Sequence, residues 1–288
     1  MSFECSTRNW FRSLLTLALL GCAAPAPAAA AEMWDSIPPN PSVDFVYAPP
    51  KSQIYQRTYE ALKQRRTLEE LQRFVSPLRL PHHLQLQTDE CDQVNAFYNA
   101  FDRSLTLCYE LVADFVANAP KTVSPDGFVT RETAIFGSII GVLLHEGGHM
   151  MFDMFDVPRF GREEDAADEN AAFVALQFNE DVARSIVKGF AYAWKTGGDP
   201  QATSAFSDEH GTASQRLYNT LCLAYGGDPK TFGGFVDQGF LPKARATGCA
   251  EEYNQLKFAW GTTIFPYVDQ KLVTRVQQAQ WLTPEELR

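Results

Sequence analysis

The stretch "LLHEGGHMMF", residues 143–152, carries two histidines at positions i and i+4, with a glutamate directly after the first. On a helix these positions lie on one face, one turn apart, so the imidazoles of His145 and His149 can bind the same metal ion. That arrangement suits a tetrahedral Zn²⁺. Glu146 then points beside the metal, where it can take a proton from a zinc-bound water molecule. The stretch therefore predicts a hydrolytic zinc site on a helix.

A catalytic zinc site needs three protein ligands and one open position, so a further ligand must come from elsewhere in the chain. A third histidine at position 155 is excluded, because Phe155 stands there. The segment "REEDAADENAAF", residues 162–173, follows after a short loop and has the composition of a second helix. Its small alanines allow it to pack close to the first helix. Glu164 is the predicted third ligand.

Asp168 lies one turn after Glu164 on the same helix face. It is predicted to accept a hydrogen bond from a ligand histidine, most directly His145, and to fix the tautomer of that ring. The other acidic residues of the segment are predicted to face elsewhere: Glu163, Asp165 and Glu169. The alternative is that this segment is an acidic, solvated helix N-terminus, which the helix dipole favours.

A hydrolytic site also needs a donor for the negative charge that develops on the substrate oxygen. With His145 and His149 assigned to the metal, His210 is the only histidine left in the C-terminal half of the chain and is the candidate. Asp208 or Glu209 can raise its pKa and keep it charged, while Tyr218 and Arg216 are alternative donors. The other interpretation is that His210 caps or packs the helix that follows.

The histidine pair requires a long helix to hold it. The apolar run "IFGSIIGVLL" before the pair predicts one helix over residues 131–155, capped by Thr130 and ended by Pro158. Gly147 and Gly148 inside this helix each cost about 1 kcal/mol relative to alanine. Their presence indicates the close approach of a substrate or of another backbone, or else dense packing.

The remainder of the chain predicts a single α+β domain over residues 52–288, after an extended proline-rich arm at residues 32–51. The arm contains a predicted strand at residues 43–47. Alternating and strand-like patterns between Leu78 and Cys108 predict a small antiparallel or mixed sheet. Helical structure is predicted over residues 52–75, where Thr67 and Glu70 form a capping box that restarts the helix near Leu68. Further helices are predicted over residues 108–119, 131–155, 163–178, 181–195, 212–224 and 251–260.

The first 31 residues have the pattern of a signal peptide, with Arg8 and Arg12 before the apolar run "SLLTLALLG" and small residues after it. Cleavage is expected after Ala31. The alternative is lipoprotein processing at Cys22, in the stretch "LLGC". Either route predicts an exported protein, periplasmic or secreted, and no later apolar run is expected to span a bilayer.

Charge limits the class of partner. The chain of 288 residues has a formal net charge of −10, which argues against a nucleic-acid partner, because phosphate binding needs a basic surface. The expected partner is a peptide or protein substrate. The oligomeric state stays open.

Four cysteines follow the signal segment, an even number that suggests disulfides in an exported chain. The predicted pairs join sequence neighbours, Cys91 with Cys108 and Cys222 with Cys249. The alternative is that all four are buried small hydrophobic residues. A four-cysteine zinc site is excluded by the spacing, because no pair is separated by two residues.

At these motifs the chain resembles a bacterial family known only as "putative metallopeptidases", formerly a domain of unknown function. The resemblance covers roughly residues 50–270 and rests on four stretches: "CDQVNAFYNAFDRSLTLCYEL", "HEGGHMMFDMFDVPRFGREEDAADENAA", "DEHGTASQRLYNTLCLAYGGDP" and "GFLPKARATGCAEEY". The spacing E-x-x-A-D is also similar to that of gluzincin peptidases. The resemblance implies a zincin-like fold, with His145, His149 and Glu164 as zinc ligands and Glu146 as the base.

The leading functional hypothesis is a zinc-dependent peptidase of the cell envelope or exterior. A strand of the small sheet, either residues 105–108 or residues 95–98, is expected to pair with an extended substrate. One alternative is a non-catalytic, zinc-stabilised binding module of the cell envelope, although such a module has no need for Glu146. The other is a zinc amidase that acts on cell-wall material.

Overall fold

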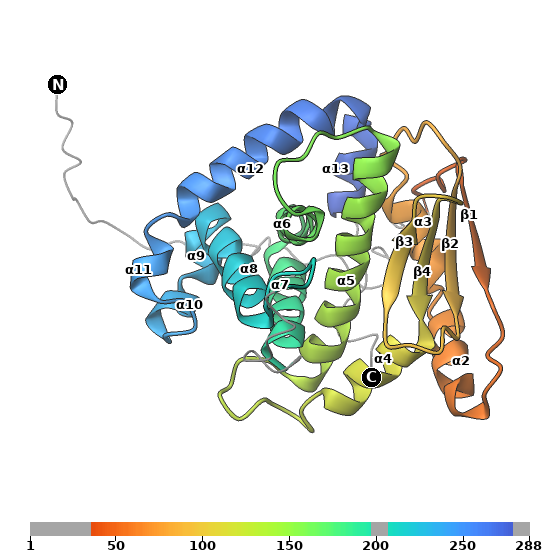
Figure 1. Cartoon of the computed structure of the whole chain (residues 1–288), viewed down its shortest axis with the longest axis horizontal. Coiled ribbons are helices and arrows are strands. Elements are labelled where there is room, and N and C mark those ends of the chain that lie inside the picture. Colours follow the sequence, from red (N-terminus) through yellow and green to blue (C-terminus); the bar gives the residue numbers. More distant parts are fainter. Residues whose placement is uncertain (1–35, 197–206, 279–288) are drawn as a thin grey trace, which may run out of the picture.

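A computed structural model of the chain describes residues 36–196 and 207–278. The predicted signal segment, its cleavage after Ala31 and the alternative anchor at Cys22 lie outside the described residues. Figure 1 shows a sheet on one side of the molecule and a group of helices on the other, with the long helix α5 (Arg131–Met154) between them. The α+β class predicted from the sequence is confirmed.

The sheet is mixed, and its strand order is β1-β2-β4-β3. Strands β1 (Val43–Tyr47), β2 (Leu84–Asp89) and β4 (Ser104–Cys108) are parallel, while β3 (Ala96–Asn99) is antiparallel to β4. The predicted strand in the proline-rich arm is thus part of the sheet, as β1. Because β4 is paired on both sides, the prediction that residues 105–108 receive a substrate strand is wrong. Of the two predicted segments, only the one that forms β3 lies at an edge of the sheet.

Helix α5 forms the centre of the protein. The side chain of Thr130 accepts a hydrogen bond from the backbone amide of Thr133, so the predicted N-cap is confirmed. Of the helices in the described ranges, α5 alone is long and apolar enough to cross a membrane, and 83% of its apolar window is buried inside the protein. Its apolar side chains therefore form the core between the sheet and the other helices.

Two glycines bring α7 (Glu180–Thr196) against the first half of α5. A Cβ atom added at Gly137 would lie 2.0 Å from the carbonyl oxygen of Ser185, and one added at Gly189 would lie 2.4 Å from that of Thr133. Such distances exclude any side chain. The two helix backbones are therefore in direct contact, which fixes α5 before it reaches the histidine pair.

The predicted helices are present with boundaries that differ by a few residues. Predicted helix 52–75 is divided into the 3₁₀ turn Gln53–Tyr55, α2 (Gln56–Gln64) and α3 (Thr67–Phe74). The others are α4 (Tyr109–Asn118), α6 (Glu163–Ala175), α8 (Ala213–Gly227) and α12 (Cys249–Thr263). Short helices that the sequence pattern did not predict follow α8, namely α9 (Pro229–Phe232), α10 (Gly234–Asp237) and α11 (Lys243–Ala246), and α13 (Gln270–Gln278) follows α12.

Both predicted disulfides are formed. Cys91–Cys108 joins the segment before β3 to the end of β4, and Cys222–Cys249 joins α8 to the start of α12. The alternative of free buried cysteines is therefore wrong. Two disulfides in one chain indicate an oxidising compartment, such as the cell exterior or the periplasm.

The Cys222–Cys249 bond should contribute strongly to stability, because it closes a loop with a sequence separation of 27 residues. Removing it by Cys222→Ala with Cys249→Ala should lower the free energy of unfolding by about 3 kcal/mol, since the unfolded chain loses a constraint. Calorimetry should then find the midpoint of thermal unfolding lowered by roughly 6–12 °C. Superimposable unfolding curves for the variant and the wild type would contradict this.

Candidate functional site

The site lies where α6 crosses the second half of α5. A Cβ atom added at Gly148 would lie 3.1 Å from the Cα atom of Ala167, so the two backbones approach closely at this point. The side-chain amide of Asn170 donates a hydrogen bond of 3.1 Å to the carbonyl oxygen of Leu144 and sets the register of the two helices. One of the two motif glycines is thus explained by helix packing, as the sequence indicated.

This crossing brings together the three predicted metal ligands. One side-chain atom from each of His145, His149 and Glu164 lies within 4.8 Å of the others. The Nε2 atom of His145 is 3.1 Å from Glu164 Oε2 and 3.2 Å from His149 Nε2, while His149 Nε2 is 3.4 Å from Glu164 Oε1. Two imidazole nitrogens and one carboxylate oxygen are a donor set that suits Zn²⁺.

Asp168 makes the predicted contact with His145. Its Oδ1 atom is 2.8 Å from His145 Nδ1, on the side of the ring away from Glu164. Arg216 of α8 donates to both oxygens of Asp168, from Nε at 2.6 Å and from Nη2 at 2.7 Å. Burial favours protonation of Asp168, but the hydrogen bonds from Arg216 and His145 outweigh it and lower the pKa of the carboxyl group. Arg216 is therefore committed to Asp168 and is a poor candidate for the donor to a substrate.

Glu163 is a residue that the sequence interpretation placed wrongly. It was predicted to face away from the site, yet its Oε1 atom is 2.9 Å from His149 Nδ1. Glu163 is the first residue of α6, where its long side chain can reach along the helix axis to α5, and Arg159 holds its other oxygen at 2.8 Å. Burial lowers the pKa of His149, but the hydrogen bonds with Glu164 and Glu163 outweigh it and raise that pKa to about 9.

Glu146 is buried and contacts the edge strand of the sheet. Its Oε2 atom accepts a hydrogen bond of 2.9 Å from the backbone amide of Tyr98, in β3. The Tyr98 hydroxyl donates to Asp153 at 2.8 Å, which anchors the strand to α5. Burial raises the pKa of Glu146 above its usual value. The role of Tyr98 was missed because a backbone amide carries no signal in the sequence.

His210 joins the same cluster. Its Nε2 atom is 2.9 Å from Glu164 Oε2, and its Nδ1 atom is 2.8 Å from Asp208 Oδ1. The hydrogen bond with Glu164 is the main cause of its raised pKa. The N-cap of the following helix is Thr212, which forms a capping box with Gln215. The alternative that His210 caps this helix is therefore wrong.

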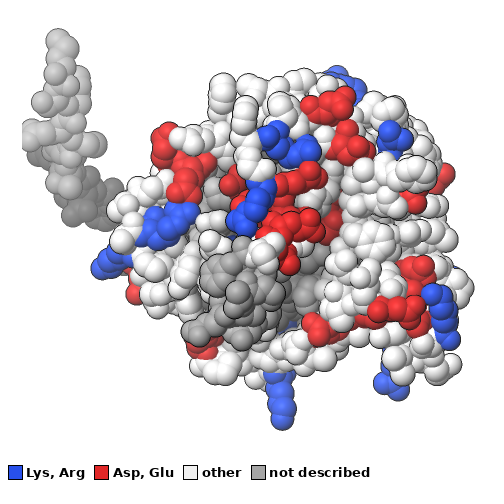
Figure 2. Space-filling view, in the orientation of Figure 1, with Lys and Arg blue, Asp and Glu red and all other residues white. Residues whose placement is uncertain are grey.

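A cavity of about 370 Å³ lies beside this cluster. His145, Glu146 and His210 contribute polar atoms to its wall. The apolar part of the wall comes from several elements, and its larger side chains are Leu111, Phe115, Val142 and Trp194. Figure 2 shows acidic side chains gathered in the middle of one face, over the position that α6 has in Figure 1. The candidate site is thus a partly apolar hollow beside a strongly acidic group of side chains.

Comparison with known proteins places the chain in a family. The family model described as "Putative metallopeptidase" matches residues 47–264. No curated protein and no solved structure matches the chain. The matched region includes every site residue described above, and the family description implies a metal ion and hydrolytic chemistry. The chain belongs to this family of "putative metallopeptidases".

Proposed function

We propose that the protein is a zinc-dependent peptidase in which His145, His149 and Glu164 hold the metal and Glu146 is the general base. The observation that carries the proposal is the convergence of the three ligand atoms within 4.8 Å, beside a buried carboxylate that is not one of them. When bound, zinc polarises the scissile carbonyl and lowers the pKa of the attacking water. The geometry of the chain supports the remaining roles.

Glu146 accepts the proton of the attacking water and delivers it to the amine that leaves. Its carboxylate lies in the wall of the cavity, and its burial raises its pKa. A base whose pKa is raised towards the working pH transfers a proton more effectively in both directions. The hydrogen bond from the Tyr98 amide holds the carboxylate in place.

His210 donates a hydrogen bond to the oxygen on which negative charge develops, from Nε2, which would exchange its contact with Glu164 for the substrate when Glu164 binds the metal. It lines the same cavity, and Glu164 and Asp208 favour its charged form. One positioned donor of this kind typically stabilises the developing charge by roughly 3–4 kcal/mol.

The edge of β3 is the proposed binding place for the substrate backbone. The amide of Tyr98 points away from β4, towards Glu146. In an antiparallel pair the outward groups alternate, so Ala96 presents its amide and carbonyl at the same edge, where it lines the cavity. An extended peptide can add to this edge as a further strand. The apolar wall formed by Phe115, Val142 and Trp194 then favours a large apolar side chain next to the scissile bond.

The alternatives are less well supported. A structural zinc site is closed by four protein ligands, whereas here a cluster of three ligands reaches, through His145, a cavity that Glu146 also lines. A zinc amidase that acts on cell-wall material would use the same polar groups. The apolar wall of the cavity favours a peptide side chain over a carbohydrate. Export to the periplasm or the cell exterior is part of the proposal and accords with the two disulfides.

The role of the base is tested by Glu146→Gln. The variant should keep the zinc content of the wild type and lose cleavage of a broad peptide library by more than about 100-fold, because the amide cannot accept the proton. Metal analysis and mass spectrometry of the library give the two readouts. Bound zinc without cleavage by the wild type would favour the binding module, and activity on muropeptides alone would favour the amidase.

Glu164→Ala should lose most of the bound zinc, because two histidines alone do not make a stable site. Asp165→Ala is the matched control, since Asp165 is the next residue of α6 and pairs with Arg162 instead. Atomic absorption of the two purified variants measures the metal directly. Equal zinc content would remove Glu164 from the ligand set.

Asp168→Ala should weaken zinc affinity or activity by roughly 10- to 100-fold, because His145 loses the partner that fixes its ring. The same change leaves Arg216 unpaired and buried, so thermal stability must be measured in parallel. A competition titration with a zinc chelator, at a temperature where the variant is folded, gives the affinity. An unchanged affinity would assign Asp168 to structure alone.

His210→Ala should lower kcat by roughly 100-fold with little change in KM or in zinc content, because the lost hydrogen bond matters mainly in the transition state. Steady-state kinetics on the best peptide from the library separates kcat from KM. A variant with normal kcat would return His210 to a structural role.

A further inference from the structure

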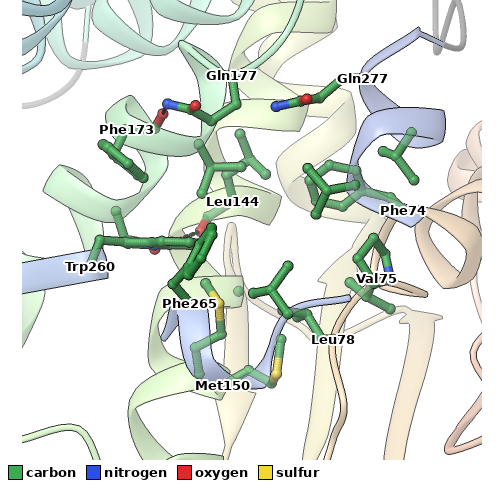
Figure 3. Close-up of a pocket in the computed structure, with 18 of the residues that line it drawn as sticks. Phe74, Val75, Leu78, Leu144, Met150, Phe173, Gln177, Trp260, Phe265 and Gln277 are labelled. Atoms are coloured by element: carbon green, nitrogen blue, oxygen red, sulfur yellow. Dashed lines mark hydrogen bonds between the residues drawn. The ribbon is translucent and has the colours of Figure 1, made fainter. Parts of the chain in front are cut away.

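A second and larger cavity, of about 600 Å³, lies on the face of α5 opposite the histidine pair. Leu143, Gly147 and Met150 of α5 line it, whereas His145 lines the smaller cavity on the other face of the helix. The remaining walls are formed by the sheet and by α3, α6, α12 and α13. Figure 3 shows Phe74, Leu78, Leu144, Met150 and Phe265 directed into this space. Its volume is within the range of small-molecule sites, roughly 300–1,000 Å³.

Gly147 links this cavity to the zinc motif. A Cβ atom added there would meet nothing within 4 Å, so packing within the protein does not require a glycine. This contrasts with Gly148, whose place is explained by α6. Alanine would stabilise the helix at such a position by about 1 kcal/mol. The free space over Gly147 is part of the cavity, and a glycine there keeps the surface of α5 open to whatever occupies it.

The lining favours a long apolar chain with a negative end. Its side chains are mainly aliphatic, aromatic and thioether groups, and an apolar cavity of this kind excludes water and takes up apolar ligands. Among the residues that the structure describes, none of those lining the cavity is acidic, although the whole chain has a net charge of −10. The one cation is Lys257 of α12, whose side chain is exposed and therefore marks the opening.

We propose that this cavity binds one free long-chain fatty acid, with the acyl chain against Gly147 and the carboxylate near Lys257. The amide side chains of Gln177 and Gln277 lie on one side of the cavity (Figure 3), and the Gln177 amide donates to the carbonyl oxygen of Phe173. The ligand would contact the back of the helix that carries the histidine pair. The inference concerns binding alone and does not depend on the proposed peptidase activity.

The experiment is a calorimetric titration of the purified chain with palmitate, below the concentration at which palmitate forms micelles. One saturable site is expected. Val273→Trp places an indole in the cavity. It should weaken palmitate binding by more than about tenfold, because the indole takes the space of the acyl chain, which then buries less apolar area. Leu272→Trp is the matched control, since it adds the same side chain at the preceding residue of α13, which does not line the cavity. It should bind as the wild type does.

A second pair of variants tests the charged end and does not disturb the core. Lys257→Glu should weaken palmitate binding by about fivefold and leave the binding of hexadecanol, which has no charge, unchanged. Lys271→Glu, on the exposed side of α13, should change neither. Tenfold weaker binding by both tryptophan variants, or equal losses in both charge variants, would overturn the proposal.

Other occupants give different results. If residues 279–288 of the chain itself fill the cavity, the full chain would not bind palmitate and a chain ending at Gln278 would bind it. If a phospholipid is the ligand, a lysophosphatidylglycerol with the same acyl chain would bind and palmitate would not. Either result, or the absence of saturable binding, would overturn the fatty-acid site.

Discussion

The contact between α5 and α6 is the constraint on which the site depends. Gly148 allows the backbone of α6 to approach at Ala167, with only 3.1 Å from an added Cβ atom to the neighbouring Cα atom. A larger side chain at either position would move α6 outwards and separate Glu164 from the two imidazoles. The hydrogen bond from Asn170 to the carbonyl of Leu144 fixes how far one helix is shifted along the other. The ligand geometry is therefore a consequence of backbone packing.

The second constraint is charge. Glu163, Glu164 and Asp168 all contact the ligand histidines, and the buried carboxylate of Glu146 lies beside them. Arg216 offsets the charge of Asp168, and Arg159 offsets that of Glu163. Buried carboxylates without compensating positive charge are unfavourable. Glu146 and Glu164 therefore favour either protonated histidines or a bound cation. A divalent metal ion supplies this positive charge, which accords with the family and with the proposed zinc.

Features that repeat with the helix period could be predicted from the sequence, because they are local. The histidine pair, Glu164 with Asp168, and the long helix between the sheet and the helical half all follow from positions four residues apart. The order of the strands and the contacts of Tyr98, Glu163 and Arg216 could not be predicted. Each depends on which distant elements meet in space, and the Tyr98 contact uses a backbone amide that every residue but proline carries. The cavity behind Gly147 is likewise visible only once several elements are packed.

The central claim is that two imidazoles and one carboxylate from α5 and α6 hold a zinc ion. X-ray absorption at the zinc edge, on protein loaded with one equivalent of Zn²⁺, tests it most directly. The account predicts a first shell of nitrogen and oxygen atoms at about 2.0–2.1 Å, with the scattering pattern of two imidazole rings. A sulfur shell at about 2.3 Å, or an oxygen shell without imidazole scattering, would contradict it.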